Sequence, residues 1–155
     1  MSGGEDAAEA AAAAPARTGP FWDVMEGRAP PPPAAELLGF ELVSVDPQAG
    51  TIEVAFEATE QFLNPAGTVQ GGLLAAMLDD TLGPALVATL SDGEWAPTTD
   101  LHVQFLSPAR PGRLLGRGRI VRRGGQVAFM TGDLSDEDGN LLATATATAS
   151  IRRRA

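Results

Sequence analysis

Several residue types on which functional sites are commonly built are missing or nearly missing from this sequence. Its 155 residues include no cysteine, no lysine and no tyrosine, and the only histidine is His102. The absence of cysteine excludes disulfide frameworks, thiolate zinc sites and cysteine nucleophiles. Without lysine or tyrosine, neither Schiff-base chemistry nor a tyrosine acid is available. One histidine does not build a histidine metal site, so we expect no metal and no other cofactor.

Positive charge is scarce and unevenly distributed. Twenty acidic residues against eleven arginines give a net charge of -9, which argues against nucleic acid as a partner. Residues 1–100 carry sixteen acids and two arginines, whereas residues 101–155 carry four acids and nine arginines. The basic part either meets a phosphorylated ligand or forms solvated strand faces.

Long hydrophobic runs are also missing. The longest strongly apolar helical stretch, residues 73–78, ends at two aspartates, and a membrane span needs about twenty apolar residues. The alanine-rich N-terminus carries acids and no early basic residue, unlike a secretory signal or a mitochondrial transit peptide. We expect a cytoplasmic protein without a membrane partner.

The remaining sequence divides into a tail and one domain. Residues 1–19 are low-complexity Ala/Gly/Glu/Pro, which predicts a disordered tail, and residues 20–155 predict a single domain. Its predicted elements are a short apolar docking helix at 21–25, one helical turn at 34–38, strands at 40–45 and 51–56, a long helix at 71–90, and strands at 98–106, 113–122, 126–134 and 141–151.

The long helix should be buried, because residues 71–90 are apolar on nearly every side. Gly83 and Pro84 predict a kink or a local tightening within it. The later strands offer room for this helix, since Gly116 and Gly118 share one face and alanine alternates with threonine over 141–151. We predict an α+β fold in which a curved antiparallel sheet wraps around one central helix.

Two stretches carry candidate chemistry, NPAGTVQGGLLAAMLDD at 64–80 and TTDLHVQFLSP at 98–108. Together they resemble the hot-dog-fold acyl-CoA thioesterases of the phenylacetate-degradation (PaaI-like) type. That family has an Asn, a Gly, a His-Gly-Gly opening the central helix, an acid two turns later, and a strand of the form acidic-Leu-x-x-x-aromatic-Leu-x-Pro. The resemblance runs from about residue 37 to 151. It implies a hot-dog fold, hydrolysis of acyl-CoA to a carboxylic acid and CoA, and a homodimer with shared active sites or a homotetramer built as a dimer of dimers.

Gly71 and Gly72 stand at the predicted helix start, where the first N–H groups lack intrahelical partners and the helix dipole adds positive charge. Such a site suits a thioester carbonyl oxygen that gains negative charge in the transition state. The alternative is a loop-to-helix turn in which glycine serves packing.

Asp79 and Asp80 interrupt the apolar helix. Neighbours on a helix point about 100° apart, so we expect only one of them to face a pocket. The resemblance selects Asp79 as the catalytic acid, either general base or nucleophile. Asp80 then serves orientation, a contact between subunits or solvent.

The resemblance also bears on four other positions. Gln70 replaces the usual histidine of the family, and glutamine can donate and accept hydrogen bonds but does not titrate. Asn64 either orients the water or carbonyl, or shapes the turn before Pro65. Thr98 matches a position that often carries a hydroxyl near the water, whereas His102 is expected to be structural.

The spacing of the two candidate groups favours a site made by two subunits. Gly71 and Asp79 are eight residues apart, about 12 Å along a helix axis. One helix does not easily bring both to one carbonyl carbon, whereas two helices related by a two-fold axis do.

The substrate that the resemblance implies is an acyl-CoA. Gly72 would lie against it, and Arg122 and Arg123, with Gly125 in the turn beside them, are candidates to meet its phosphates. The alternative function is a non-catalytic acyl-CoA or lipid-binding hot-dog protein, which the loss of histidine at Gln70 favours. A hot-dog dehydratase or hydratase would need a histidine and an acid in the site, and His102 lies on a strand well after the helix.

Overall fold

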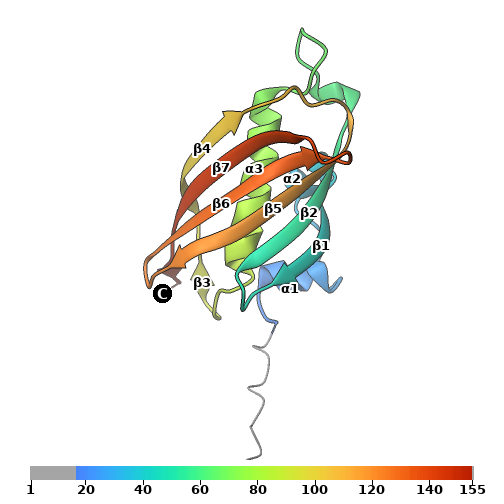
Figure 1. The fold of residues 1–155 in the computed structure, drawn as a ribbon. Helices are drawn as coiled ribbons and strands as arrows, with labels where there is room; N and C mark the ends of the chain where they lie inside the picture. The colour runs from blue at the N-terminus through green and yellow to red at the C-terminus, as the bar shows by residue number, and fades with distance from the viewer. Residues whose placement is uncertain (1–16, 155) are drawn as a thin grey trace, which may run out of the picture.

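The helices and strands follow the predicted order along the chain (Figure 1). Two strands precede one long helix, and the remaining strands follow it. The structure, a computed structural model, describes residues 17–154. Its helices are α1 (Pro20–Met25), α2 (Pro33–Leu38), the 3-10 turn η1 (Glu60–Phe62) and α3 (Gly71–Val87). Its strands are β1 (Glu41–Asp46), β2 (Thr51–Ala58), β3 (Glu94–Trp95), β4 (Thr98–Phe105), β5 (Gly112–Arg123), β6 (Val127–Asp136), β7 (Leu141–Ser150) and β8 (Arg152–Arg153).

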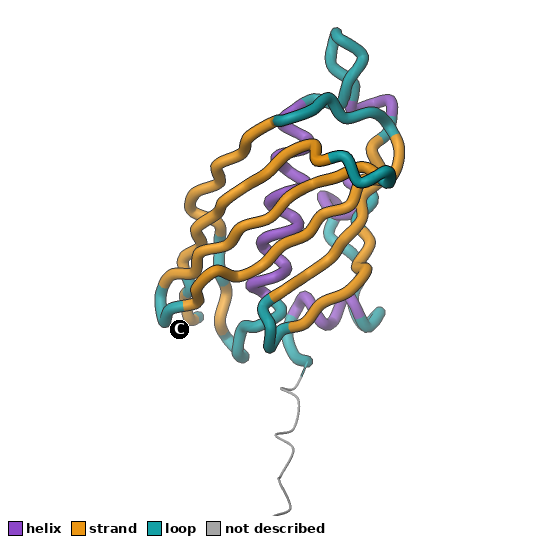
Figure 2. Tube along the Cα trace, in the orientation of Figure 1, coloured by secondary structure: helices purple, strands orange, loops and turns teal. Residues whose placement is uncertain are grey.

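Six strands form one antiparallel sheet in the order β1-β2-β5-β6-β7-β4. Figure 2 shows this sheet as one layer, with the long helix α3 lying across its inner face. The α+β hot-dog architecture predicted from the sequence is therefore confirmed. The short β3–β8 pair was not predicted, because each of its strands has only two residues.

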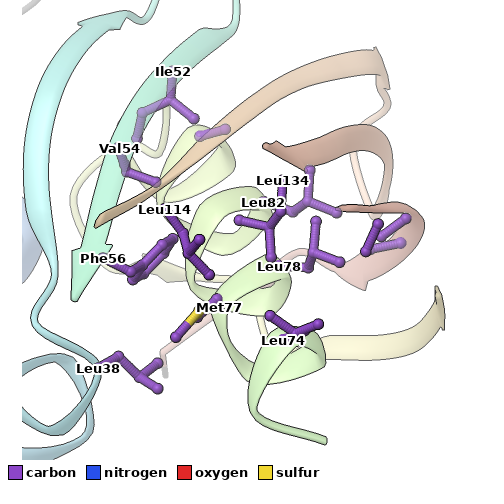
Figure 3. Close-up of a cluster of buried hydrophobic side chains, with 14 of the residues drawn as sticks. Leu38, Ile52, Val54, Phe56, Leu74, Met77, Leu78, Leu82, Leu114 and Leu134 are labelled. Carbon is purple, nitrogen blue, oxygen red and sulfur yellow. The ribbon is translucent and has the colours of Figure 1, made fainter. Parts of the chain in front are cut away.

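The core lies between α3 and the sheet (Figure 3). The buried side chains of α3 recur with the helical period and include Leu74, Met77, Leu78, Leu82 and Leu86. The sheet supplies alternating residues, because successive side chains of a strand point to opposite faces. On β7 the inward positions are the alanines expected from the sequence, from Ala143 to Ala149.

Three glycines on β5 and β6 allow α3 to approach the sheet closely. A Cβ at Gly116 or Gly118 would press on Thr81 of α3, and a Cβ at Gly132 would lie 2.9 Å from Leu82 Cδ2. Real Cβ atoms essentially never come that close to another heavy atom. The small residues noted in the sequence are thus required by helix packing.

The predicted helix boundary at residue 90 was wrong by one turn. Helix α3 ends at Val87, and the last α-helical bond runs from Ala88 N to Pro84 O at 3.0 Å. Beyond it, Thr89 N donates to Leu86 O at 2.9 Å and Leu90 N to Val87 O at 3.1 Å. These tighter bonds are typical of a terminal turn, where carbonyl groups run out of helical partners. The helix continues through Pro84 rather than stopping there.

The N-terminal part of the domain is attached to the body. Trp22 of α1 is buried, Arg17 lies over its ring at 4.7 Å, and Thr18 Oγ1 donates to Asp92 Oδ1 at 2.6 Å. Residues 1–16 of the predicted tail lie outside the described residues. Over residues 17–154, no helix is long and apolar enough to cross a membrane.

We predict that Gly132→Ala destabilises the protein by about 1–3 kcal/mol, the usual cost of overpacking a core. The added Cβ would meet the backbone carbonyl of Arg117 and the side chain of Leu82, and neither can move without disturbing the sheet or α3. Urea unfolding followed by circular dichroism measures the change. Gly125→Ala is the matched control, since its Cβ meets nothing within 4 Å, and equal stability of the two variants would contradict the packing argument.

Candidate active site

The loop before α3 is shaped by the side chain of Asn64. Asn64 Oδ1 accepts hydrogen bonds from Ala66 N at 2.9 Å and Thr68 N at 3.2 Å, and Asn64 Nδ2 donates to Thr68 Oγ1 at 3.0 Å. These contacts hold the turn of residues 64–68, as expected for Asn before proline. One N–H of the amide remains for a ligand, because Asn has two donors on Nδ2.

The start of α3 presents free backbone donors. Gln70 is the N-cap residue, and its side chain makes no capping hydrogen bond. Within residues 17–154, the N–H groups of Gly71 and Gly72 have no hydrogen-bond partner. A Cβ at Gly71 would lie 3.2 Å from the ring of Phe105, whereas Gly72 faces open space. Glycine at 71 therefore serves packing, and the free donors beside it still form a positive helix end.

Asp79 and Thr98 meet although they are far apart in the sequence. Asp79 is exposed in the middle of α3, Thr98 begins β4, and Thr98 Oγ1 donates to Asp79 Oδ1 at 2.8 Å. This bond fixes one carboxylate oxygen and leaves Asp79 Oδ2 without a protein partner among the described residues. The structure thus joins the two residues that the resemblance placed near the water.

Asp80 was expected to point away from the pocket that Asp79 faces. Both Asp79 and Asp80 line one pocket, so the expectation that only one of them would face it was wrong. Among residues 17–154, Asp80 Oδ2 is buried without a hydrogen-bond partner. Burial, followed by the charge of Asp79, raises the pKa of Asp80 to about 6. In addition, Pro84 has no N–H, which removes the usual helical partner of the Asp80 carbonyl.

The pocket shared by these carboxyl groups has a volume of about 550 Å³. One wall is α3, from Asp79 to Val87, and the other is built by α1, α2, the prolines between them and β1. Sequence reasoning identified the short helix at 21–25 but not its place in the site. The apolar spacing of Phe21, Val24 and Met25, at i, i+3 and i+4, was the available signal.

The predicted phosphate-binding residues do not join this pocket. Arg122, Arg123 and Gly125 lie at the β5–β6 hairpin, and none of them is among the residues that line the pocket. Arg123 pairs with Glu94 at 3.0 Å, while Arg122 is exposed. Part of the basic half therefore neutralises acids from the first hundred residues.

The chain thus carries two separate groups along α3. Gln70, Gly71 and Gly72 form its N-terminal end, with Asn64 in the turn of residues 64–68 before it, whereas Asp79 and Thr98 lie two turns further. Since α3 is continuous from Gly71 to Val87, the rise of about 1.5 Å per residue separates Gly71 from Asp79 by about 12 Å. Among residues 17–154, no group of His, Asp and Glu could hold a metal ion.

Comparison with known proteins finds similar sequences. The sequence model of the thioesterase superfamily matches residues 66–143. Mouse acyl-coenzyme A thioesterase 13 is 33% identical over 104 residues, which cover 66% of this chain and 72% of the mouse protein.

Solved structures give the same result for the fold. The phenylacetic acid degradation-related protein of Ralstonia eutropha JMP134 is 47% identical, with a TM-score of 0.81 over 84% of this chain and 98% of that chain. The PaaI protein of E. coli, at 20% identity, shares the fold with a TM-score of 0.75, over 87% of this chain and 94% of that chain.

We predict that Asp80→Asn stabilises the protein more at pH 7.5 than at pH 5. The pKa of Asp80 is raised to about 6 in the folded chain, above the ordinary value of about 3.9. Stability is therefore lost as pH rises through this window, because ionised Asp80 is disfavoured by folding. Urea midpoints at both pH values measure the effect. The control is Asp138→Asn, at an exposed turn, and a gain equal at both pH values would contradict the assignment.

Proposed function

This chain belongs to the thioesterase superfamily, and we propose that it hydrolyses acyl-CoA thioesters to a carboxylic acid and CoA with Asp79 as the catalytic carboxylate. The family model and the similarity to acyl-coenzyme A thioesterase 13 support the reaction. The observation that carries the residue assignment is the hydrogen bond from Thr98 to Asp79 at the pocket.

The arrangement suits attack by water. With Asp79 Oδ1 held by Thr98, the other oxygen accepts a proton from a water molecule as that water attacks the thioester carbon. The carbonyl oxygen becomes negative, and the C–S bond breaks when the tetrahedral intermediate collapses. The proton held on Asp79 then passes to the departing thiolate of CoA.

The developing oxyanion requires donors that α3 of the same protomer cannot supply at this distance. The free N–H of Gly71 in a second protomer donates a hydrogen bond to this oxyanion. The active protein is then a homodimer with two shared sites. Strand β4 supports this assembly, because it is an edge of the sheet and exposes Phe105. Unpaired apolar edges favour pairing with another chain.

Gln70 occupies the position of the family histidine and contributes hydrogen bonds rather than proton transfer. The proton chemistry of the site therefore falls to Asp79. If Gln70 instead makes the protein a non-catalytic binder, acyl-CoA will bind without turnover, and a hydrolysis assay with binding measured in parallel separates the two functions.

We predict that Asp79→Asn lowers kcat/KM for acyl-CoA by about 100- to 10,000-fold, the usual contribution of a general base. Asp80→Asn should lose less, because Asp80 lacks the contact with Thr98. Thiol release from a panel of acyl-CoAs provides the assay. The control is Asp138→Asn, at an exposed turn, which should retain full activity. A larger loss in Asp80→Asn, in a folded protein, would overturn the choice of Asp79.

A further inference from the structure

The pocket beside Asp79 changes character along α3. Its polar lining consists of Asp79, Asp80 and Thr98, all at the turn where hydrolysis is proposed. One and two turns further along the helix the lining is Gly83, Pro84 and Val87, and the residues opposite, from α1, α2 and β1, are apolar. The pocket therefore extends about 12 Å along α3 from the carboxylate, at about 1.5 Å per residue over eight residues.

We propose that this pocket receives the acyl group of the thioester, and that Gly83 determines how large a group can enter. The inference rests on the hydrolysis of acyl-CoA proposed above. An apolar chain whose carbonyl lies at Asp79 is the ligand that fits this lining, because apolar pockets bind apolar groups and use a few polar groups for orientation.

Gly83 is not required by the fold. It lies inside a helix, where glycine costs about 1 kcal/mol relative to alanine. Its backbone is not in the left-handed region, and a Cβ there would meet nothing within 4 Å. The neighbouring residue is Pro84, which also disfavours a helix interior. Helical stability is thus given up at two consecutive residues that both line the pocket, and Gly83 leaves open space where a side chain would project.

The opposite wall is fixed to the body of the protein. Trp22 is 4% exposed and meets Phe21 edge to face at 5.0 Å between ring centroids. Just before α1, Thr18 Oγ1 donates to Asp92 Oδ1 at 2.6 Å. With α1 anchored in this way, Phe21, Val24 and Met25 line the pocket while remaining only partly buried. A larger side chain at Gly83 of α3 should therefore reduce the size of the acyl group that the pocket accepts. A smaller side chain at Met25 of α1 should increase it.

The test compares Gly83→Leu and Met25→Ala with wild type on acetyl-, hexanoyl-, decanoyl- and palmitoyl-CoA. Gly83→Leu should lower kcat/KM for decanoyl-CoA by about tenfold or more, the scale on which a methylene is discriminated, while acetyl-CoA changes less than about twofold. Met25→Ala should move the preference to longer chains. Gly83→Ala should fold at least as well as wild type. Leu37→Ala is the control, since Leu37 is exposed on α2 and outside the pocket.

Binding of decanoate, measured by calorimetry, keeps the inference testable if the hydrolysis proposal fails. Gly83→Leu should bind decanoate at least about tenfold more weakly than wild type. Equal loss on every acyl-CoA, or unchanged decanoate binding in folded Gly83→Leu, would overturn the acyl pocket. Absence of hydrolysis in wild type with decanoate binding that depends on Gly83 would overturn the thioesterase proposal alone.

Discussion

The packing of α3 against the inner face of the sheet is the constraint on which the rest of the molecule depends. The helix buries Leu74, Leu78 and Leu82, and at about 25 cal/mol per Å² of apolar surface such side chains supply about 1.5–3 kcal/mol each. Close contact is possible because β5 and β6 carry glycine where the helix approaches, as at Gly116 and Gly132. These contacts fix both the rotation of α3 and its position along the sheet.

Once the rotation of α3 is fixed, so is the side of the helix that the sheet does not cover. That side carries residues 79, 80, 83, 84 and 87, and all of them line the pocket. The positions of Asp79, the proposed catalytic carboxylate, and of the apolar lining beside it are therefore consequences of one packing arrangement. The rigidity of α3 also holds Gly71 away from Asp79 by about 12 Å, which is why we propose that the Asp79 carboxylate and the oxyanion donor Gly71 N–H come from different protomers.

The sequence predicted the sheet and the buried helix, because apolar periodicity and small-residue strand faces are local signals. Asp79 was selected by the family resemblance, and its catalytic role stays a prediction. The sequence did not predict that Asp80 would share the pocket. A separation of about 100° between neighbours suggested different surroundings, but both residues line the pocket whose other wall is built by α1 and α2. The apolar pattern at 21–25 predicted a short docking helix, and Trp22 is buried. It did not predict that α1 would dock beside Asp79 and Asp80, because that contact is long-range. The end of α3 at Val87 depended on terminal hydrogen bonds that composition does not show.

Sharing of the site between protomers is the central claim, and mixed dimers test it most directly. Asp79→Ala and Asn64→Ala chains, each inactive alone, are allowed to exchange, with heterodimer formation checked by differently tagged chains. Asn64 either contacts the ligand or holds the turn of residues 64–68. In both cases Asn64→Ala should impair the site at the N-terminal end of α3 in the same chain. Random pairing makes about half the dimers mixed, each with one intact site, so about a quarter of wild-type activity should return. Activity near zero in confirmed heterodimers would contradict the shared site.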